Sequence, residues 1–264
     1  MKRDVSSRIA LTVTEPAELV FAVAVSQHYA PVSERIAATV DGKPLEAEEL
    51  LDAHGTRLHR VLAPAGEFVM EYAATVGDGE PAGGDEVERL VFLRQSRYAE
   101  SDAMAPTAAA EFQGIQGGVQ LLASVSSWVG TRLAYVPGSS LPTDGATRTL
   151  LARQGVCRDY AHLCIALLRG LGIPARMVAV YAPGLHPMDF HAVAEAWIDG
   201  GWRVVDATTL APRPSLVRIA TGRDAADTAF LTVVSGRADL VDVTVAATAE
   251  HLPEDDLDTL VSIA

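Results

Sequence analysis

The sequence predicts an α+β protein: an N-terminal antiparallel β-sandwich-like domain followed by a domain of helices packed on an antiparallel sheet. The first third contains short segments rich in β-branched and aromatic residues, separated by turn residues. Later segments show helical apolar periodicity first and strand-like runs afterwards. Helices and strands grouped in this way favour α+β architecture, and 264 residues that are 49% hydrophobic can bury a substantial core.

Five β-strands are expected in the N-terminal domain, because several of these segments alternate apolar with polar residues. They cover residues 8–14, 18–26, 35–41, 56–63 and 66–76. The polar, glycine-rich stretch Gly77–Asp85 (GDGEPAGGD) follows and is the best candidate for a linker. The predicted domains are therefore residues 1–85, an N-terminal β domain, and 86–264, a catalytic domain.

The second domain is expected to begin with helices and to continue as strands. Apolar residues at helical spacing and terminating Gly and Pro residues place helices at 119–133, 146–153 and 156–171. Strand-like runs follow at 177–181, 190–198, 202–207, 230–234 and 241–247. The acidic stretch at 253–258 is expected to be solvated.

Charge and apolar content disfavour several classes of partner. The chain carries 34 acidic against 21 basic residues, a formal net charge of −13, which should repel phosphate backbones and anionic lipid. No run approaches the ~20 apolar residues of a membrane helix, and no export signal is expected. Cys157 and Cys164 would lie ~10 Å apart on one helix, too far to pair. Free thiols favour a reducing, cytoplasmic location.

Cys157 is the candidate nucleophile because it lies in the first turn of the predicted helix at 156–171. Free N–H groups and the positive end of the helix dipole stabilise a thiolate there, and Arg158 is adjacent. Cys164 lies in mid-helix among Leu163 and Ile165, where a cysteine is expected to be a small core residue. The same core role is the alternative for Cys157.

His191 and Asp206 are predicted to share one face of a hairpin. Asp199-Gly200 favours a two-residue type I′ turn. With those residues as the loop, Val193 lies opposite Asp206, and His191 is diagonal to it at about 7–8 Å between backbones. A carboxylate beside an imidazole orients the ring and stabilises its protonated form; the alternative is an ordinary solvated pair.

Together the three residues predict thiol acyl-transfer chemistry. Thiolate attack on a carbonyl would give a thioester, and His191 would form an ion pair with Cys157 and protonate the leaving amine. The backbone N–H of Cys157 would be an oxyanion donor.

Four segments carry a family resemblance: GVCRDYAHL (155–163), GLGIPAR (170–176), MDFHAVAEAW (188–197) and GGWRVVDAT (200–208). They resemble the transglutaminase-like superfamily and, within it, the bacterial cysteine-protease-like branch. LRQSRYAESD (93–102) is similar to the segment LRPSRYCESD that closes the family's N-terminal β domain, from which Gln95 and Ala99 depart.

The resemblance implies a papain/transglutaminase-like catalytic domain with Cys157, His191 and Asp206 as its triad, and no cofactor. Related enzymes complete the oxyanion hole with an upstream side chain, for which Trp128 and Tyr135 are the candidates; core packing is the alternative for each. Family gene neighbourhoods imply an ATP-grasp partner.

Competing functions have weaker support in the sequence. A zinc site drawing on Cys157, Cys164, His186, Asp189 and His191 lacks the ligand spacing of known zinc motifs, so no metal is expected. A non-catalytic binding module on the same fold stays open.

The expected function is hydrolysis of a peptide or isopeptide amide, as a cysteine protease or amidase acting on a peptide or protein. Transglutaminase-type amine transfer is the alternative, because both reactions pass through the same thioester. The N-terminal β domain is expected to shape the substrate cleft or to form a homo-oligomer.

Overall fold

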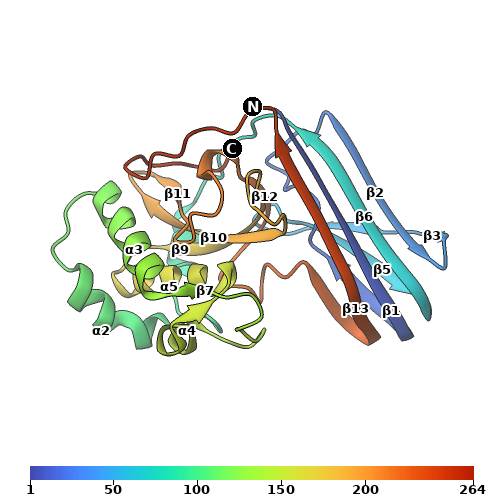
Figure 1. The fold of residues 1–264 in the computed structure, drawn as a ribbon, viewed down its shortest axis with the longest axis horizontal. Coiled ribbons are helices and arrows are strands. Elements are labelled where there is room, and N and C mark those ends of the chain that lie inside the picture. The colour runs from blue at the N-terminus through green and yellow to red at the C-terminus, as the bar shows by residue number, and fades with distance from the viewer.

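A seven-stranded antiparallel sheet forms one half of the protein (Figure 1). The structure is a computed structural model that describes all residues, 1–264. The central strand β1 (Arg3–Phe21) pairs with β13 along one side and with β6 and then β5 along the other. The remaining strands are β2 (Ser33–Val40), β3 (Lys43–Leu45), β4 (Glu48–Leu51), β5 (Arg57–Ala63), β6 (Gly66–Val76) and β13 (Leu231–Ala249).

The strand β1 is continuous where the sequence predicts two strands, at residues 8–14 and 18–26. Its pairing with β13 shifts register between Val13 and Glu15 and again between Glu15 and Glu18. These irregularities accommodate the Glu15-Pro16 step without ending the strand. Opposite them, Gly236 has a φ of 77°, and a Cβ there would lie 2.1 Å from the Pro16 carbonyl oxygen. The bulge therefore requires glycine.

The other half packs helices on a four-stranded antiparallel sheet of order β11-β10-β9-β12, which confirms the predicted α+β class. Its sheet strands are β9 (Ala175–Tyr181), β10 (Phe190–Ile198), β11 (Gly201–Val205) and β12 (Val217–Gly222). Its helices are α1 (Glu86–Val91), α2 (Ser101–Phe112), α3 (Gly118–Arg132), α4 (Ala146–Ala152) and α5 (Cys157–Gly170). Two-residue strands β7 (Ala134–Tyr135) and β8 (Gln154–Gly155) pair in parallel, and η1 (Arg213–Ser215) is a 3₁₀ turn.

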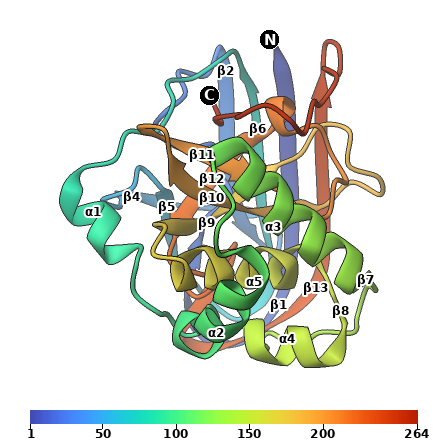
Figure 2. The same ribbon diagram turned by 90° about the vertical axis from the view of Figure 1, so that its left-hand side faces the viewer.

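The helix α5 is the centre of this half (Figure 2). It is buried almost all round, because it is surrounded by protein on every side. Eleven of its residues, from Asp159 to Arg169, are buried. One side packs on β9 and β10, and the others meet α2, α3 and α4. No helix is long and apolar enough to cross a membrane.

The chain returns to the N-terminal sheet near its end, which the sequence analysis did not foresee. Residues 231–249, assigned there to the second domain, form β13 and pair with β1 from Arg3 to Phe21. One hydrophobic core also spans both halves, joining Ile9 and Phe68 to Val217 and Ile219. The helices α1 and α2 were not predicted either. The division at residue 85 remains a prediction about folding units.

The stretch Gly77–Asp85 lies against both halves. A Cβ on Gly79 would lie 2.8 Å from the Tyr29 ring, and one on Gly84 would lie 2.7 Å from the Trp197 ring. The predicted linker is therefore packed in place, and its glycines allow the close approach.

A buried ionic network joins the sheet strands to α1. Glu195 is fully buried and accepts hydrogen bonds from Arg176 Nε (2.9 Å) and Arg218 Nη2 (2.6 Å). Arg176 also reaches Glu88 of α1 at 2.8 Å and lies 3.9 Å from the centre of the Trp202 ring. Burial opposes ionisation of Glu195, but Arg218 and Arg176 outweigh it and lower its pKa to about 2.

We expect Glu195→Ala to destabilise the protein by about 3–5 kcal/mol, because it leaves two buried guanidinium groups without their shared carboxylate. Urea denaturation at neutral pH measures the change. The matched control Glu71→Ala removes a carboxylate from an exposed pair with Arg35 and should change stability by less than about 1 kcal/mol. Equal effects of the two substitutions would contradict a structural role for the network.

Candidate active site

Cys157 is the first residue of α5 and is half-buried. The turn before it is held by Asp159, a fully buried residue whose Oδ2 accepts the Val156 N–H at 2.8 Å. The other oxygen of Asp159 accepts the Ser140 hydroxyl at 2.9 Å. A Cβ on Gly155 would lie 2.7 Å from the Asp159 Cβ. Cys157, the candidate nucleophile, therefore lies in a tightly packed first turn of α5, where the free backbone N–H groups favour a negative charge.

The hairpin of β10 and β11 has the predicted register. Asp199 and Gly200 both have positive φ, 50° and 75°, as a type I′ turn requires, and Ile198 pairs with Gly201. Beyond the last pair, His191 Nε2 lies 2.8 Å from Asp206 Oδ2. His191 is 2% exposed and Asp206 is 3% exposed, so the predicted contact exists and is buried.

The second oxygen of Asp206 is held by Thr208, which donates both its backbone N–H (2.9 Å) and its hydroxyl (2.7 Å). Sequence reasoning missed this contact, although a threonine two residues after an aspartate is a recognisable turn signal. It also missed Asp159, whose position three residues after the helix cap matches half of a capping box. The cap residue, Val156, has no polar side chain, which hid that signal.

The electrostatics of the site favour a protonated His191. Its Nδ1 is buried and has no hydrogen-bond partner in the structure. Burial lowers the pKa of His191, but the charge of Asp206, their hydrogen bond and the nearby Cys157 outweigh it and raise the pKa to about 10. Burial raises the pKa of Asp206, but the charge of His191 and the hydrogen bonds from His191 and Thr208 outweigh it, so the pKa of Asp206 is lowered. The His191 ring thus contacts the Asp206 carboxylate, lines the same cavity as Cys157, and is in a setting that favours its protonated form.

Tyr135 lies beside the thiol, and Trp128 does not. Tyr135 of β7 pairs with Gly155 of β8, which leads directly into α5. Burial, then the charge of Cys157, raises the pKa of Tyr135 to about 12. The Trp128 indole N–H instead donates to Glu111 of α2 at 2.8 Å. Of the two residues considered for an oxyanion hole, Tyr135 therefore lies beside Cys157, and the indole N–H of Trp128 is engaged with α2.

Cys164 and His162 are both buried in the helix core. Burial raises the pKa of the Cys164 thiol. His162 Nε2 accepts the Ala225 N–H at 3.1 Å, and burial lowers its pKa to about 3. Neither residue contributes a charge to the site. No cluster of three His, Cys, Asp or Glu side chains is arranged to hold a metal ion.

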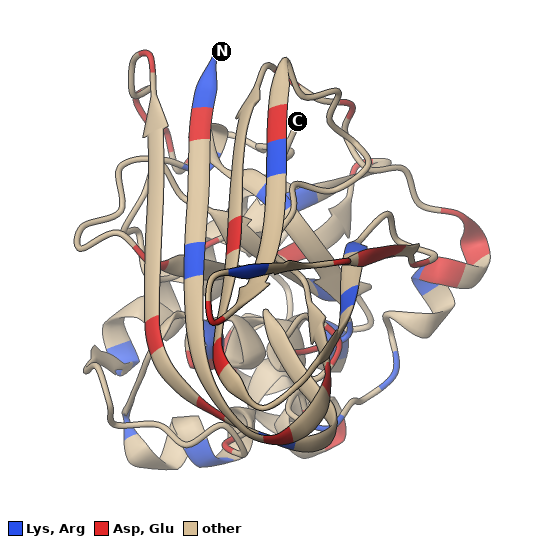
Figure 3. Ribbon diagram, turned by 90° about the vertical axis from the view of Figure 1, so that its right-hand side faces the viewer, with Lys and Arg blue, Asp and Glu red and all other residues tan.

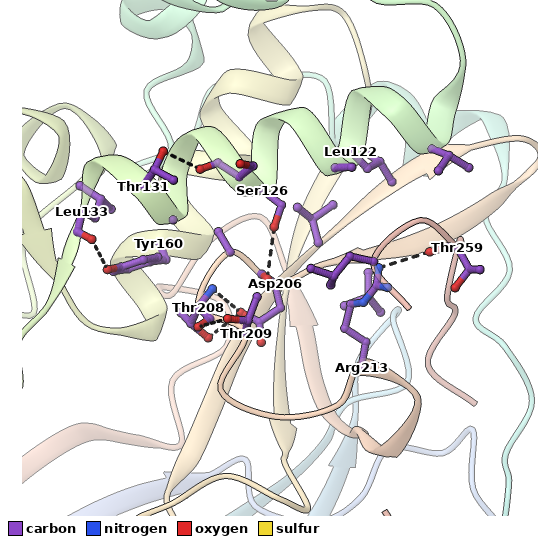
Figure 4. A pocket seen from close by; sticks show the side chains of 18 of the residues that line it. Leu122, Ser126, Thr131, Leu133, Tyr160, Asp206, Thr208, Thr209, Arg213 and Thr259 are labelled. Carbon is purple, nitrogen blue, oxygen red and sulfur yellow. Dashed lines mark hydrogen bonds between the residues drawn. The ribbon is translucent and has the colours of Figure 1, made fainter. Parts of the chain in front are cut away.

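Two cavities flank the site. One, of about 690 Å³, is lined by Cys157, Arg158 and His191 and extends to the N-terminal sheet. The other, of about 590 Å³, lies between α3 and the loop after β11 and is lined by Tyr135 and Asp206 (Figure 4). Its lining includes six serine and threonine residues: Ser126, Ser127, Thr131, Thr208, Thr209 and Thr259.

A buried helix that begins with a cysteine and packs on a sheet carrying a His–Asp pair defines a papain/transglutaminase-like fold. Residues 106–207 match the family model of the transglutaminase-like superfamily. A protein from Cytophaga hutchinsonii, whose crystal structure describes it as a candidate cysteine protease, is 35% identical over 99% of this chain and 96% of its own, with a TM-score of 0.88. The chain belongs to the transglutaminase-like superfamily.

Two mycobacterial proteins are similar in sequence to part of this chain. An uncharacterized protein of Mycobacterium leprae is 31% identical over 126 residues, 43% of this chain and 44% of its own length. An uncharacterized protein of Mycobacterium tuberculosis (strain H37Rv) is 36% identical over 106 residues, 37% of this chain and 34% of its own. The match thus spans less than half the length of either relative.

The raised pKa of His191 predicts a pH-dependent contribution to stability. The protonated ring stabilises the fold fully below pH about 6.5 and ceases to do so as pH rises through about 10. Between these values the wild-type free energy of unfolding should fall by at least about 1 kcal/mol more than that of His191→Gln. Asp206→Asn should remove the same slope, whereas His186→Gln, at an exposed site, should retain it. Parallel pH profiles of wild type and His191→Gln would contradict the ion pair.

Proposed function

We propose that the protein is a cysteine-dependent acyl-transfer enzyme that hydrolyses a peptide or isopeptide amide through a thioester on Cys157. The observation that carries the proposal is the buried contact of His191 with Asp206, next to a cysteine at the start of a buried helix. Such a thiol, base and orienting carboxylate are the parts that nucleophilic catalysis requires.

The proposed reaction begins with attack of the Cys157 thiolate on the substrate carbonyl carbon. The backbone N–H of Cys157 and the Tyr135 hydroxyl would stabilise the oxyanion. As the C–N bond breaks, His191 donates its proton to the departing amine, leaving the acyl group as a thioester. A water molecule then attacks the thioester while His191 takes its proton, and the thiolate departs as the acid is released. Asp206 orients the ring through both steps.

Hydrolysis is placed before amine transfer because the similar protein from Cytophaga hutchinsonii is described as a candidate cysteine protease. Amine transfer remains the second candidate. The hydroxyl-lined cavity beside Tyr135 suits either the leaving half of a peptide or an amine acceptor. A binding module without chemistry is disfavoured, because keeping an ionised pair buried carries a desolvation penalty that binding alone does not explain.

A peptide or protein substrate is part of the proposal, as is a cytoplasmic location, which suits the two free thiols. Nucleic acid remains a poor partner, since acidic and basic residues are interspersed over the N-terminal sheet instead of forming a basic face (Figure 3). An ATP-grasp partner, which rests on family analogy, and self-association through the N-terminal sheet stay as proposals.

Iodoacetamide at pH 7 should label Cys157 at least about tenfold faster than free glutathione, since only the thiolate reacts and ordinary thiols are a few per cent ionised. Cys164, with its raised pKa and no exposed surface, should remain unlabelled over the same time. Mass spectrometry of tryptic peptides measures both sites. Cys164→Ser should keep the fast phase and Cys157→Ser should lose it. Slow labelling of both cysteines would refute the thiolate.

The fate of the thioester separates the two activities. With p-nitrophenyl acetate as acyl donor, we expect acetate as the main product even with a primary amine such as cadaverine in excess, because the proposed acceptor is water. Chromatography of acetate and acetylated amine gives the ratio, and Cys157→Ala controls for uncatalysed reaction. Predominant acetylation of the amine would assign a transglutaminase-type activity instead.

A further inference from the structure

The cavity beside Cys157 continues along the sheet beyond the start of α5. Its floor includes Ala179 of β9 and Ala192 of β10, which are paired across the strands. Residues on this face of the sheet further along, such as Met177 and Ala194, pack against the core around α5. The helix α5 covers the sheet only as far as its own first turn. Beyond that turn, an apolar part of the sheet faces a cavity of about 690 Å³.

Small side chains keep this cavity open. Besides the two alanines of the floor, Ala225, Ala226 and Ala229 line it from the segment between β12 and β13. A stacked aromatic pair forms another part of the lining: the rings of Phe190 and Phe230 lie 5.3 Å apart at 22°. Alanines next to an aromatic platform leave room for a bulky apolar group and offer it a surface on which to pack.

The charges of the cavity are confined to the neighbourhood of the thiol. Arg158 follows Cys157 directly in the sequence, and Asp189 is two residues before His191; all four residues line the cavity. None of the other lining residues is charged, and fourteen of the nineteen are hydrophobic. A charged group deeper in the cavity would lose its hydration without gaining a partner, whereas an apolar group would gain by burial.

The N-terminal sheet supplies part of the wall. Leu231 and Val243 of β13, and Ala22 at the end of β1, line the cavity with residues of the four-stranded sheet. The pairing of β13 with β1 therefore helps to enclose the cavity.

We propose that this cavity is the specificity pocket for the acyl donor and accepts a bulky aromatic or branched apolar side chain next to the scissile carbonyl. The inference rests on the proposed function, because it takes Cys157 as the reacting group. Ala226 and Ala229, both exposed on the segment that lines the cavity, control its free volume.

Paired alkylating probes test this without a known substrate. Iodoacetamide and N-benzyl iodoacetamide react identically, a C–S bond forming as iodide leaves, and differ only in the apolar group. The benzyl probe should label Cys157 at least about tenfold faster than iodoacetamide, after division by the same ratio for glutathione, because its ring is buried on reaching the thiol. Ala229→Trp should bring this corrected ratio close to one by filling the pocket, and Ala226→Trp provides a second test should the first variant not fold.

The matched control is Ala30→Trp, at an exposed loop alanine that does not line the cavity, which should leave the corrected ratio unchanged. The pocket proposal would be wrong if wild-type Cys157 and glutathione showed the same ratio of benzyl-probe rate to iodoacetamide rate. It would also be wrong if the corrected ratio stayed unchanged in both tryptophan variants. If Cys157 reacts rapidly with both probes but shows no preference for the benzyl probe, only the inference about the pocket fails. Slow labelling by both probes defeats the proposed thiolate, which keeps the two failures distinct.

Discussion

The burial of α5 is the constraint on which the position of the site depends. Eleven consecutive residues of the helix are buried, so it can neither slide along its axis nor rotate without exposing apolar surface or opening cavities in a close-packed core. Asp159 fixes the first turn from within the same core. The Cys157 thiol is therefore held at one place, beside the part of the sheet that α5 leaves uncovered and near His191, the second residue of β10.

The second determinant is the way the two sheets are joined. The strand β13 closes the N-terminal sheet against β1, and Glu195 holds two arginines inside the other half. Because a single core crosses the boundary, relative movement of the halves would break the packing between them. The apolar cavity at their junction is lined by residues of both halves, so its shape depends on how the two sheets are joined.

Those parts of the site that depend on local chemistry were predictable from the sequence. A two-residue Asp-Gly turn sets the strand register by its backbone geometry alone, which was enough to bring His191 and Asp206 to one face. A helix that starts after Gly155 is likewise a local feature, and it separated Cys157 from Cys164. Each of these inferences uses residues within about one hairpin or helix of each other, where few competing arrangements exist.

Only the tertiary structure shows which distant segments of the chain pair with each other. Nothing in residues 231–249 indicates a partner more than two hundred residues earlier, because strand periodicity reports a buried face and not the strand that pairs with it. The same limit left Trp128 and Tyr135 equivalent until the pairing of β7 with β8 carried Tyr135 to the thiol. The sequence by itself thus determined the class of fold and the strand register that brings His191 to Asp206. The walls of the cleft were decided by long-range packing, since they are formed by segments that meet only when both sheets are assembled.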